Sequence, residues 1–100
     1  MTVAADEFHH AMIDLYEVAK ASDYFATYFK QMLDQYRGVE TAKRLLARSE
    51  IQPGLMRLWE LKLLGKSVEA TVLQDRFQPL FTQAELDEAY RRLEELNYFK

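Results

Sequence analysis

Hydrophobic residues recur at helical spacing from the beginning of the chain. Phe8, Met12, Leu15 and Ala19 follow one another at intervals of three or four residues, with acidic residues and His10 between them. This spacing is typical of an amphipathic helix, which has one apolar and one polar face. The first segment is therefore expected to form a helix whose apolar stripe lies in the core.

A second, wider apolar stripe follows Ser22 and Asp23, which both have the side-chain chemistry of helix N-caps. The stripe consists of Phe25, Tyr28, Phe29, Met32, Leu33 and Tyr36. Gly38 can adopt the left-handed conformation that ends many helices, so the second helix is expected to end there. A third, shorter helix should then bury three apolar residues, Ala42, Leu45 and Leu46.

The best candidate for a loop lies between residues 49 and 54. Pro53 fits the first turn of a new helix better than a helix interior. The fourth helix that begins there is expected to bury Leu55, Leu58, Trp59 and Leu63. Gly65 offers an end to this helix, and Ser67 can cap a short fifth helix.

The clearest local signal stands in the C-terminal part of the chain. Thr82 and Glu85 have the spacing of a capping box, and Phe81 and Leu86 have that of a hydrophobic staple. A sixth helix should begin there and run to about Asn97. The sequence therefore predicts an all-α, compact single-domain bundle of about six helices, with two longer N-terminal helices packed on several short ones.

Composition supports a single helical domain over residues 1–100. Hydrophobic residues make up 49% of the chain, and only three glycines and two prolines are present, which argues against disorder. No apolar run approaches the roughly 18 residues of a membrane span, and the first residues lack a signal-peptide core. The absence of cysteine excludes disulfides and the usual structural zinc sites. We expect a cytoplasmic protein without a membrane partner.

Positive charge is concentrated in the middle of the chain, although the net charge is −3. Four cations on or beside the expected third helix form a candidate anion-binding surface, Arg37, Lys43, Arg44 and Arg48. Such a surface can bind the phosphates of nucleic acid. The helix after Gly65 is a weaker candidate for DNA recognition, because its exposed positions include Glu69 and Asp75, whose carboxylates repel phosphates.

No group of residues forms a recognisable catalytic or metal site. Asp6, His10 and Asp14 share one helical face, but a solvated polar face explains them better than a bound metal ion. Glycine-rich phosphate loops and nucleophilic serine motifs are absent from the sequence. Glu60 and Glu69 lie among apolar residues, where burial can raise a carboxyl pKa and create an acid or base. Pairing with cations is commoner, so neither an enzyme nor a cofactor is expected.

The aromatic residues lie at helical spacing, which indicates core packing more than a ligand groove. This applies to the stripe from Phe25 to Tyr36 and to Trp59, which is expected to be largely buried. Six tyrosines are nevertheless many for one small core. Tyr16 and Tyr24 are therefore candidates for an exposed partner surface, because exposed tyrosine is enriched at interface centres.

Several motifs together resemble a widespread family of short bacterial all-helical proteins of unknown function. The motifs are Gly38-Val39-Glu40-Thr41-Ala42-Lys43, Leu58-Trp59-Glu60, Ser67-Val68-Glu69-Ala70 and Pro79-Leu80-Phe81. The resemblance covers about residues 24–93 and implies a bacterial cytosolic setting and a shared fold, without a mechanism. Glu40, Glu60 and Glu69 need partners, and we expect ion pairs with the cations Lys43, Arg44 or Arg57. A functional acidic site is the alternative.

These observations favour a non-enzymatic module that binds another protein, or a second copy of itself, through an apolar and aromatic surface. The alternative is an accessory protein that binds nucleic acid or another anion through the basic segment 37–66. Salt separates the two functions, because phosphate binding weakens steeply with salt and apolar association does not.

Overall fold

The structure is a computed structural model that describes residues 3–48 and 53–99, and this part of the chain contains helices and no strand. The elements are α1 Val3–Ala21, α2 Thr27–Leu46, α3 Pro53–Glu60, the 3₁₀ turn η1 Leu64–Lys66, α4 Val68–Val72, the 3₁₀ turn η2 Gln78–Leu80 and α5 Gln83–Glu95. The predicted all-α class is confirmed. The expected count of six is too high for the described residues, because the second and third predicted helices are joined in α2.

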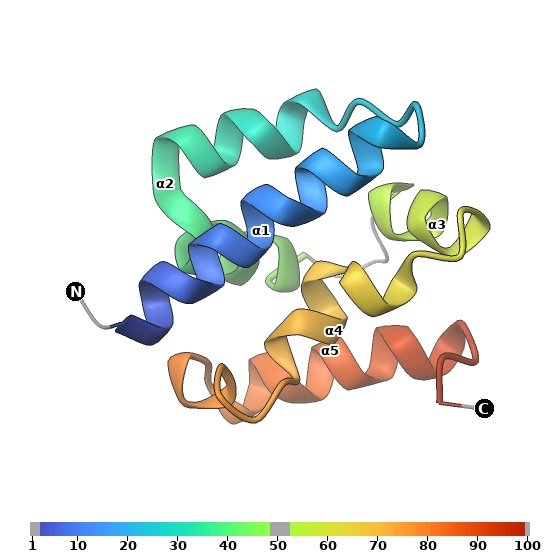
Figure 1. The fold of residues 1–100 in the computed structure, drawn as a ribbon. Helices are drawn as coiled ribbons and strands as arrows, with labels where there is room; N and C mark the ends of the chain where they lie inside the picture. Colours follow the sequence, from blue (N-terminus) through green and yellow to red (C-terminus); the bar gives the residue numbers. More distant parts are fainter. Residues whose placement is uncertain (1–2, 49–52, 100) are drawn as a thin grey trace.

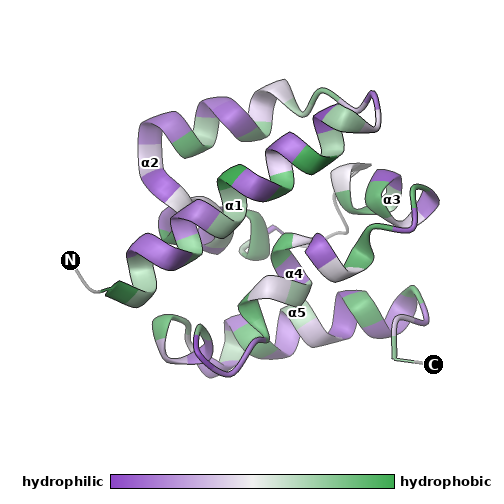
Figure 2. Ribbon diagram, in the orientation of Figure 1, coloured by the Kyte–Doolittle hydropathy of each residue, from purple (hydrophilic) through white to green (hydrophobic). Residues whose placement is uncertain are grey.

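α1 lies at the centre of the fold. In Figure 1 it runs diagonally across the molecule, with α2 on one side and α4 and α5 on the other. Its predicted apolar stripe is buried along the whole helix. Purple and green residues alternate along α1 and α5 in Figure 2, as expected for helices with one face in the core.

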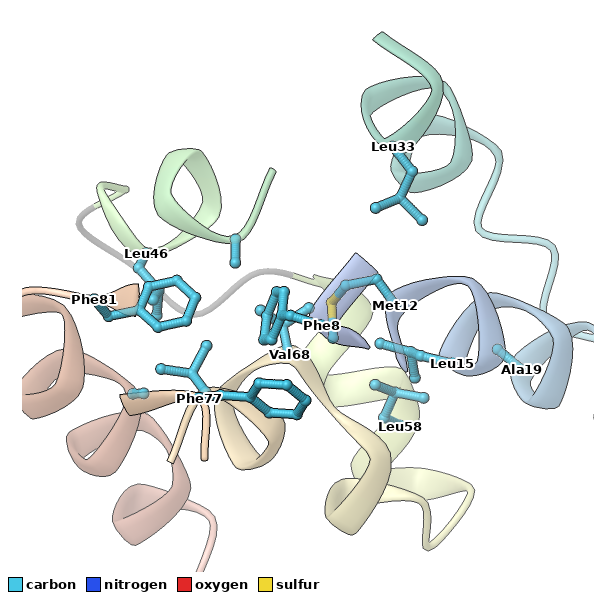
Figure 3. Packing of buried hydrophobic residues seen from close by; sticks show 13 residues of the cluster. Phe8, Met12, Leu15, Ala19, Leu33, Leu46, Leu58, Val68, Phe77 and Phe81 are labelled. Carbon is cyan, nitrogen blue, oxygen red and sulfur yellow. The ribbon is translucent and has the colours of Figure 1, made fainter. Parts of the chain in front are cut away.

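Three phenylalanine rings join α1 to the C-terminal part of the chain. Phe8 lies edge-on to Phe77 and to Phe81, with 5.2 Å between the ring centroids in each pair. Figure 3 shows these rings among aliphatic side chains from the other helices. Such aromatic pairs contribute about 0.5–1.5 kcal/mol each beyond the burial of area, so they help to fix α1 in place.

α2 reverses direction at Arg37. The backbone there has φ 65° and ψ 178°, which is not helical, while the residues on both sides are helical. In Figure 1 the first half of α2 runs beside α1 and the second half passes behind it. The prediction that Gly38 provides a left-handed helix end is wrong, because the positive φ belongs to Arg37.

Gly38 is needed for the close approach of α1. A Cβ atom at this position would lie 2.6 Å from the Cα atom of His9. The Nδ1 atom of His9 is buried there without a hydrogen-bond partner among the described residues. Burial, together with the positive charge of Arg37, lowers the pKa of His9. The two helices therefore touch backbone to backbone at a place that has no room for a side chain.

The loop between α1 and α2 ends one helix and does not cap the next. Asp23 has a φ of 65°, and the backbone hydrogen bonds of a Schellman motif close the turn after α1. The prediction that Ser22 or Asp23 caps the second helix is wrong. α2 begins later, at Thr27, and its N-cap residue Ala26 offers no side-chain hydrogen bond.

α3 ends with the same motif at Lys62, whose φ is 62°. The amide N–H of Leu63 donates to the carbonyl oxygen of Leu58 over 2.8 Å, which closes the turn. The prediction that Gly65 ends this helix is therefore wrong, and Gly65 lies within η1 without a positive φ.

Lys62→Gly is expected to stabilise the domain by up to about 1 kcal/mol, because glycine has no Cβ atom to penalise a positive φ. Lys62 is exposed, so little packing is lost. Urea unfolding measures the change, and Lys62→Ala is the control because alanine keeps the Cβ atom. Equal effects of glycine and alanine would show that this residue is not left-handed in solution.

The predicted caps of α4 and α5 are confirmed. Thr82 Oγ1 accepts a hydrogen bond from the Glu85 N–H over 3.2 Å, and the Glu85 carboxylate accepts one from the Thr82 N–H over 2.8 Å. Phe81 and Leu86, the predicted staple, lie in the same hydrophobic cluster. Ser67 Oγ accepts a hydrogen bond from a backbone N–H of α4 over 3.1 Å.

Candidate functional site

An apolar groove lies between the end of α1, the start of α2, α3 and α4. The described residues enclose a volume of about 430 Å³ there, which is within the usual size of a binding pocket. Aliphatic residues from α1, α2, α3 and α4 line it. The aromatic side chains in its walls are Tyr16, Tyr24, Phe25, Tyr28 and Phe29.

Two of these aromatic rings are largely in contact with water. Phe25 is 58% exposed and Tyr28 is 61% exposed. The hydroxyl of Tyr28 accepts a hydrogen bond from the Arg48 guanidinium over 3.3 Å, which helps to orient the ring. Exposed aromatic rings beside an apolar hollow are typical of an interaction surface.

The predicted partner residues Tyr16 and Tyr24 both line this groove. Both are half-buried, which is less exposed than expected for a partner surface. Gly54 at the start of α3 leaves room for Tyr24, because a Cβ atom there would lie 3.1 Å from the tyrosine hydroxyl. The helical spacing of Phe25 and Tyr28 predicts that both lie in the core, and this prediction is wrong for these two residues.

The four cations of the candidate anion-binding surface contact different parts of the fold. Arg37 faces α1, where its guanidinium lies 3.6 Å from the carboxylate of Asp6. Lys43 faces α5, where its ammonium group lies 2.8 Å from the carboxylate of Glu85. Partial burial raises the pKa of Glu85, but the bonds from Lys43 and Thr82 outweigh it, so the pKa is lowered.

Arg44 pairs with Glu40 over 3.0 Å and lies 3.9 Å from the centroid of the Tyr36 ring. Arg48 is bonded to Tyr28 at the groove. Carboxylates thus accompany three of the four cations, and this weakens their attraction for a polyanion. The Glu40 pair is one of those expected from the sequence.

Arg92 of α5 is fully buried, which the sequence pattern did not lead us to expect. Its guanidinium lies 3.2 Å from the Glu69 carboxylate and 2.6 Å from the Glu88 carboxylate. It also donates to the backbone carbonyl oxygens of Leu45 and Arg48, over 3.2 Å and 2.6 Å. Arg92 thus donates side-chain hydrogen bonds to carbonyl oxygens at the end of α2 and just beyond it.

Glu69 brings a carboxylate into the wall of the groove, where it is only 4% exposed. Burial raises its pKa, against the influence of Arg92. The prediction that Glu69 pairs with Lys43, Arg44 or Arg57 is wrong. The packing of α5 on α4 places Arg92 beside Glu69 instead. Position 92 lies beside the apolar stripe of Leu86, Ala89 and Leu93, and this spacing is the signal that points to its burial.

The acid stability of the domain should depend on Glu88. Hydrogen bonds from Arg91, opposed by partial burial and reinforced by Arg92, lower the pKa of Glu88 from 4.5 to about 2. A lowered folded-state pKa stabilises the fold above pH 4.5, and this stabilisation disappears as the pH falls towards 2. Glu88→Gln should therefore destabilise at neutral pH and have little effect at pH 2. Urea unfolding at several pH values tests this against the exposed control Glu94→Gln, and parallel pH profiles would contradict it.

Trp59 is 47% exposed, so the prediction of a largely buried tryptophan is wrong. Leu58 faces the core, and the next residue of a helix points about 100° away. Trp59 instead lies near Tyr98, beside a shallow hollow between η1 and the turn after α5. The neighbouring Glu60 pairs with Arg57 over 3.4 Å, as expected.

A second aromatic cluster joins α5 to the turn after it. The rings of Tyr90 and Phe99 stack with 4.6 Å between centroids, and Tyr98 lies edge-on to Phe99 at 5.3 Å. These rings are exposed. These rings lie outside the groove. Substituting them is therefore a matched control for substituting the exposed rings of the groove.

The acidic face of α1 is engaged by cations. Asp6 contacts Arg37, and the carboxylate of Asp14 lies 3.7 Å from the Lys66 ammonium. Residues 3–48 and 53–99 contain no group of three or more His, Asp or Glu side chains placed to hold a metal ion. None of the helices described has the length and apolarity needed to cross a membrane.

Comparison of the chain with protein-family models, with curated proteins and with solved structures found no match. The assignment to the all-α class therefore rests on the structure. The resemblance to the bacterial helical family stays a prediction.

Proposed function

We propose that this domain is a non-enzymatic interaction module of the bacterial cytosol, and that its groove accepts an apolar segment of another protein. The observation that carries the proposal is the hollow of about 430 Å³ with the exposed rings of Phe25 and Tyr28 beside it. Covering apolar surface is favourable by about 25 cal/mol per Å². A partner that inserts apolar side chains gains from both the aliphatic lining and the rings.

The alternative function, anion binding by segment 37–66, has weaker support. Arg37, Lys43 and Arg44 each lie within 4 Å of a carboxylate, and the acidic partners come from α1, α2 and α5. A polyanion would have to displace these carboxylates before it gained three phosphate contacts. Apolar binding at the groove has no such competitor.

The first test uses Nile red, an uncharged apolar dye whose fluorescence increases in apolar surroundings. We expect saturable one-to-one binding to the wild-type domain. The double variant Phe25→Ser/Tyr28→Ser should bind the dye about tenfold more weakly, because it loses two aromatic contacts. Both side chains are largely exposed, so the variant should keep the wild-type melting temperature.

The matched control is Tyr90→Ser/Phe99→Ser, which removes two exposed rings from the other aromatic cluster. The proposal requires this control to bind Nile red as the wild type does. Equal weakening in both double variants, or binding that does not saturate, would mean that the dye recognises exposed aromatic residues in general and not the groove.

A further inference from the structure

The reversal of α2 depends on a residue that is poorly suited to it. Arg37 has φ 65° and ψ 178°, a backbone region that is essentially restricted to glycine. The arginine side chain does not compensate strongly, because its contact with Asp6 is long, at 3.6 Å, and half exposed. Both halves of α2 are helical up to this residue. One change of backbone conformation at Arg37 would therefore make α2 a single straight helix.

Straightening α2 would separate two parts of the chain, which we name the arm, residues 3–36, and the body, residues 38–48 and 53–99. A straight α2 of 20 residues is about 30 Å long and carries the arm away from the body. The arm cannot stay in water by itself. Its residue Phe8 is fully buried and packs on two rings of the body, which would be exposed to water if the arm left.

A second copy of the chain offers the surface that such an arm requires. We propose that two copies exchange arms to form a domain-swapped dimer in which each α2 is straight. Every contact between arm and body is then formed between chains, including the ion pair of Asp14 with Lys66. The strain at Arg37 is released in both copies, while association lowers translational freedom, so the dimer should depend on concentration.

The exchange would change which chains form the groove, independently of what the groove binds. Its walls come from the arm, through Tyr16 and Tyr24, and from the body, through Leu45 and Leu58. Each groove of the swapped dimer would therefore be formed by two chains.

The experiment compares Arg37→Gly with Arg37→Ala. Both variants lose the arginine side chain and its contact with Asp6, and they differ by one methyl group. Glycine removes the strain of the bent form and disfavours the helix, whereas alanine keeps the strain and favours the helix. The two effects add to about thirtyfold or more per chain, so the dimer dissociation constant of Arg37→Ala should be about a thousandfold lower, or lower still, than that of Arg37→Gly. Sedimentation equilibrium after refolding at millimolar concentration measures it.

Carbodiimide coupling of the wild-type protein identifies the exchange. It joins a carboxylate to a nearby ammonium group, so Asp14 and Lys66 become linked. In a monomer this link lies within one chain, and in the swapped dimer it joins two chains. Mass spectrometry of a refolded mixture of ¹⁴N and ¹⁵N protein should find mixed-isotope crosslinks at this pair. Lys66→Arg, which does not couple, should remove them.

Two results would overturn the proposal. One is equal sedimentation of wild type, Arg37→Ala and Arg37→Gly as monomers up to millimolar concentration. The other is a dimer whose Asp14 to Lys66 crosslinks all lie within one chain, which would mean association without exchange. If Arg37→Ala does not fold, the wild type is compared with Arg37→Gly instead. The wild type should also form the tighter dimer of the two.

Discussion

Replacing Arg92 by methionine is expected to lower the free energy of unfolding by about 3–5 kcal/mol, which could unfold a domain of ordinary stability. The substitution leaves the Glu69 carboxylate in an apolar wall without its cation, and Glu88 loses one of its two arginine partners. It also removes the side-chain hydrogen bonds to the carbonyl oxygens of Leu45 and Arg48. Urea unfolding followed by circular dichroism measures the change.

Two controls separate this network from simple loss of charge. Arg91→Met removes the neighbouring arginine, which is 45% exposed and pairs with Glu88, and it should lower stability by about 1 kcal/mol or less. Adding Glu69→Met to Arg92→Met removes the unpaired buried carboxylate and should recover part of the loss. If Arg92→Met is within about 1 kcal/mol of the wild type, the guanidinium is not buried in solution.

Gly38→Ala is expected to lower the free energy of unfolding by about 3 kcal/mol. The added methyl group would lie 2.6 Å from the Cα atom of His9. The neighbour is backbone, so no side-chain rotation can relieve the overlap. α1 and α2 must move apart, and the apolar contacts between them weaken along their length.

Gly65→Ala is the control for this prediction. There the added methyl group would lie 3.4 Å from the Tyr98 hydroxyl, which is close to ordinary contact, and the backbone has no positive φ. This variant should change stability by less than about 1 kcal/mol. If both glycine variants melt like the wild type, α1 and α2 lie further apart than the structure places them.

Local features of the fold could be predicted from the sequence where neighbouring residues alone determine them. The stripe of α1 from Phe8 to Ala19 needs only helical spacing, and it is buried as expected. The capping box of Thr82 and Glu85 needs only two residues of one turn. The all-α class follows from such local signals repeated along the chain.

Other features depend on contacts between distant segments, and the spacing of residues along the sequence does not reveal such contacts. Gly38 suggested a left-handed helix end, whereas its role is to let His9 come close. Arg92 lies beside the apolar stripe of α5, but its partner Glu69 follows only from the packing of α4 on α5. Trp59 follows the buried residue Leu58 in a short helix, so its side chain points to a different side of that helix. Its hydrophobicity alone does not show this direction.

The sequence indicates part of the lining of the groove. The chain has more tyrosines than a small core needs, which singles out Tyr16 and Tyr24, and both line the groove. Their role as partner residues stays a prediction. The hollow itself could not be predicted, because it forms only when α3 and α4 lie against α1 and α2. Phe25 and Tyr28 have the spacing of core residues, and spacing alone does not show that both rings stay exposed beside the groove.

The most direct test of the proposed function is the affinity of a partner protein captured from the native cell, measured with purified components over a range of salt. The groove variant Phe25→Ser/Tyr28→Ser should lose the partner, and the control Tyr90→Ser/Phe99→Ser should bind it like the wild type, with affinities that change little with salt. Full binding by the groove variant would contradict the account. So would an affinity that falls steeply with salt and is lost in Arg44→Gln, because Arg44 lies outside the groove and that result indicates anion binding.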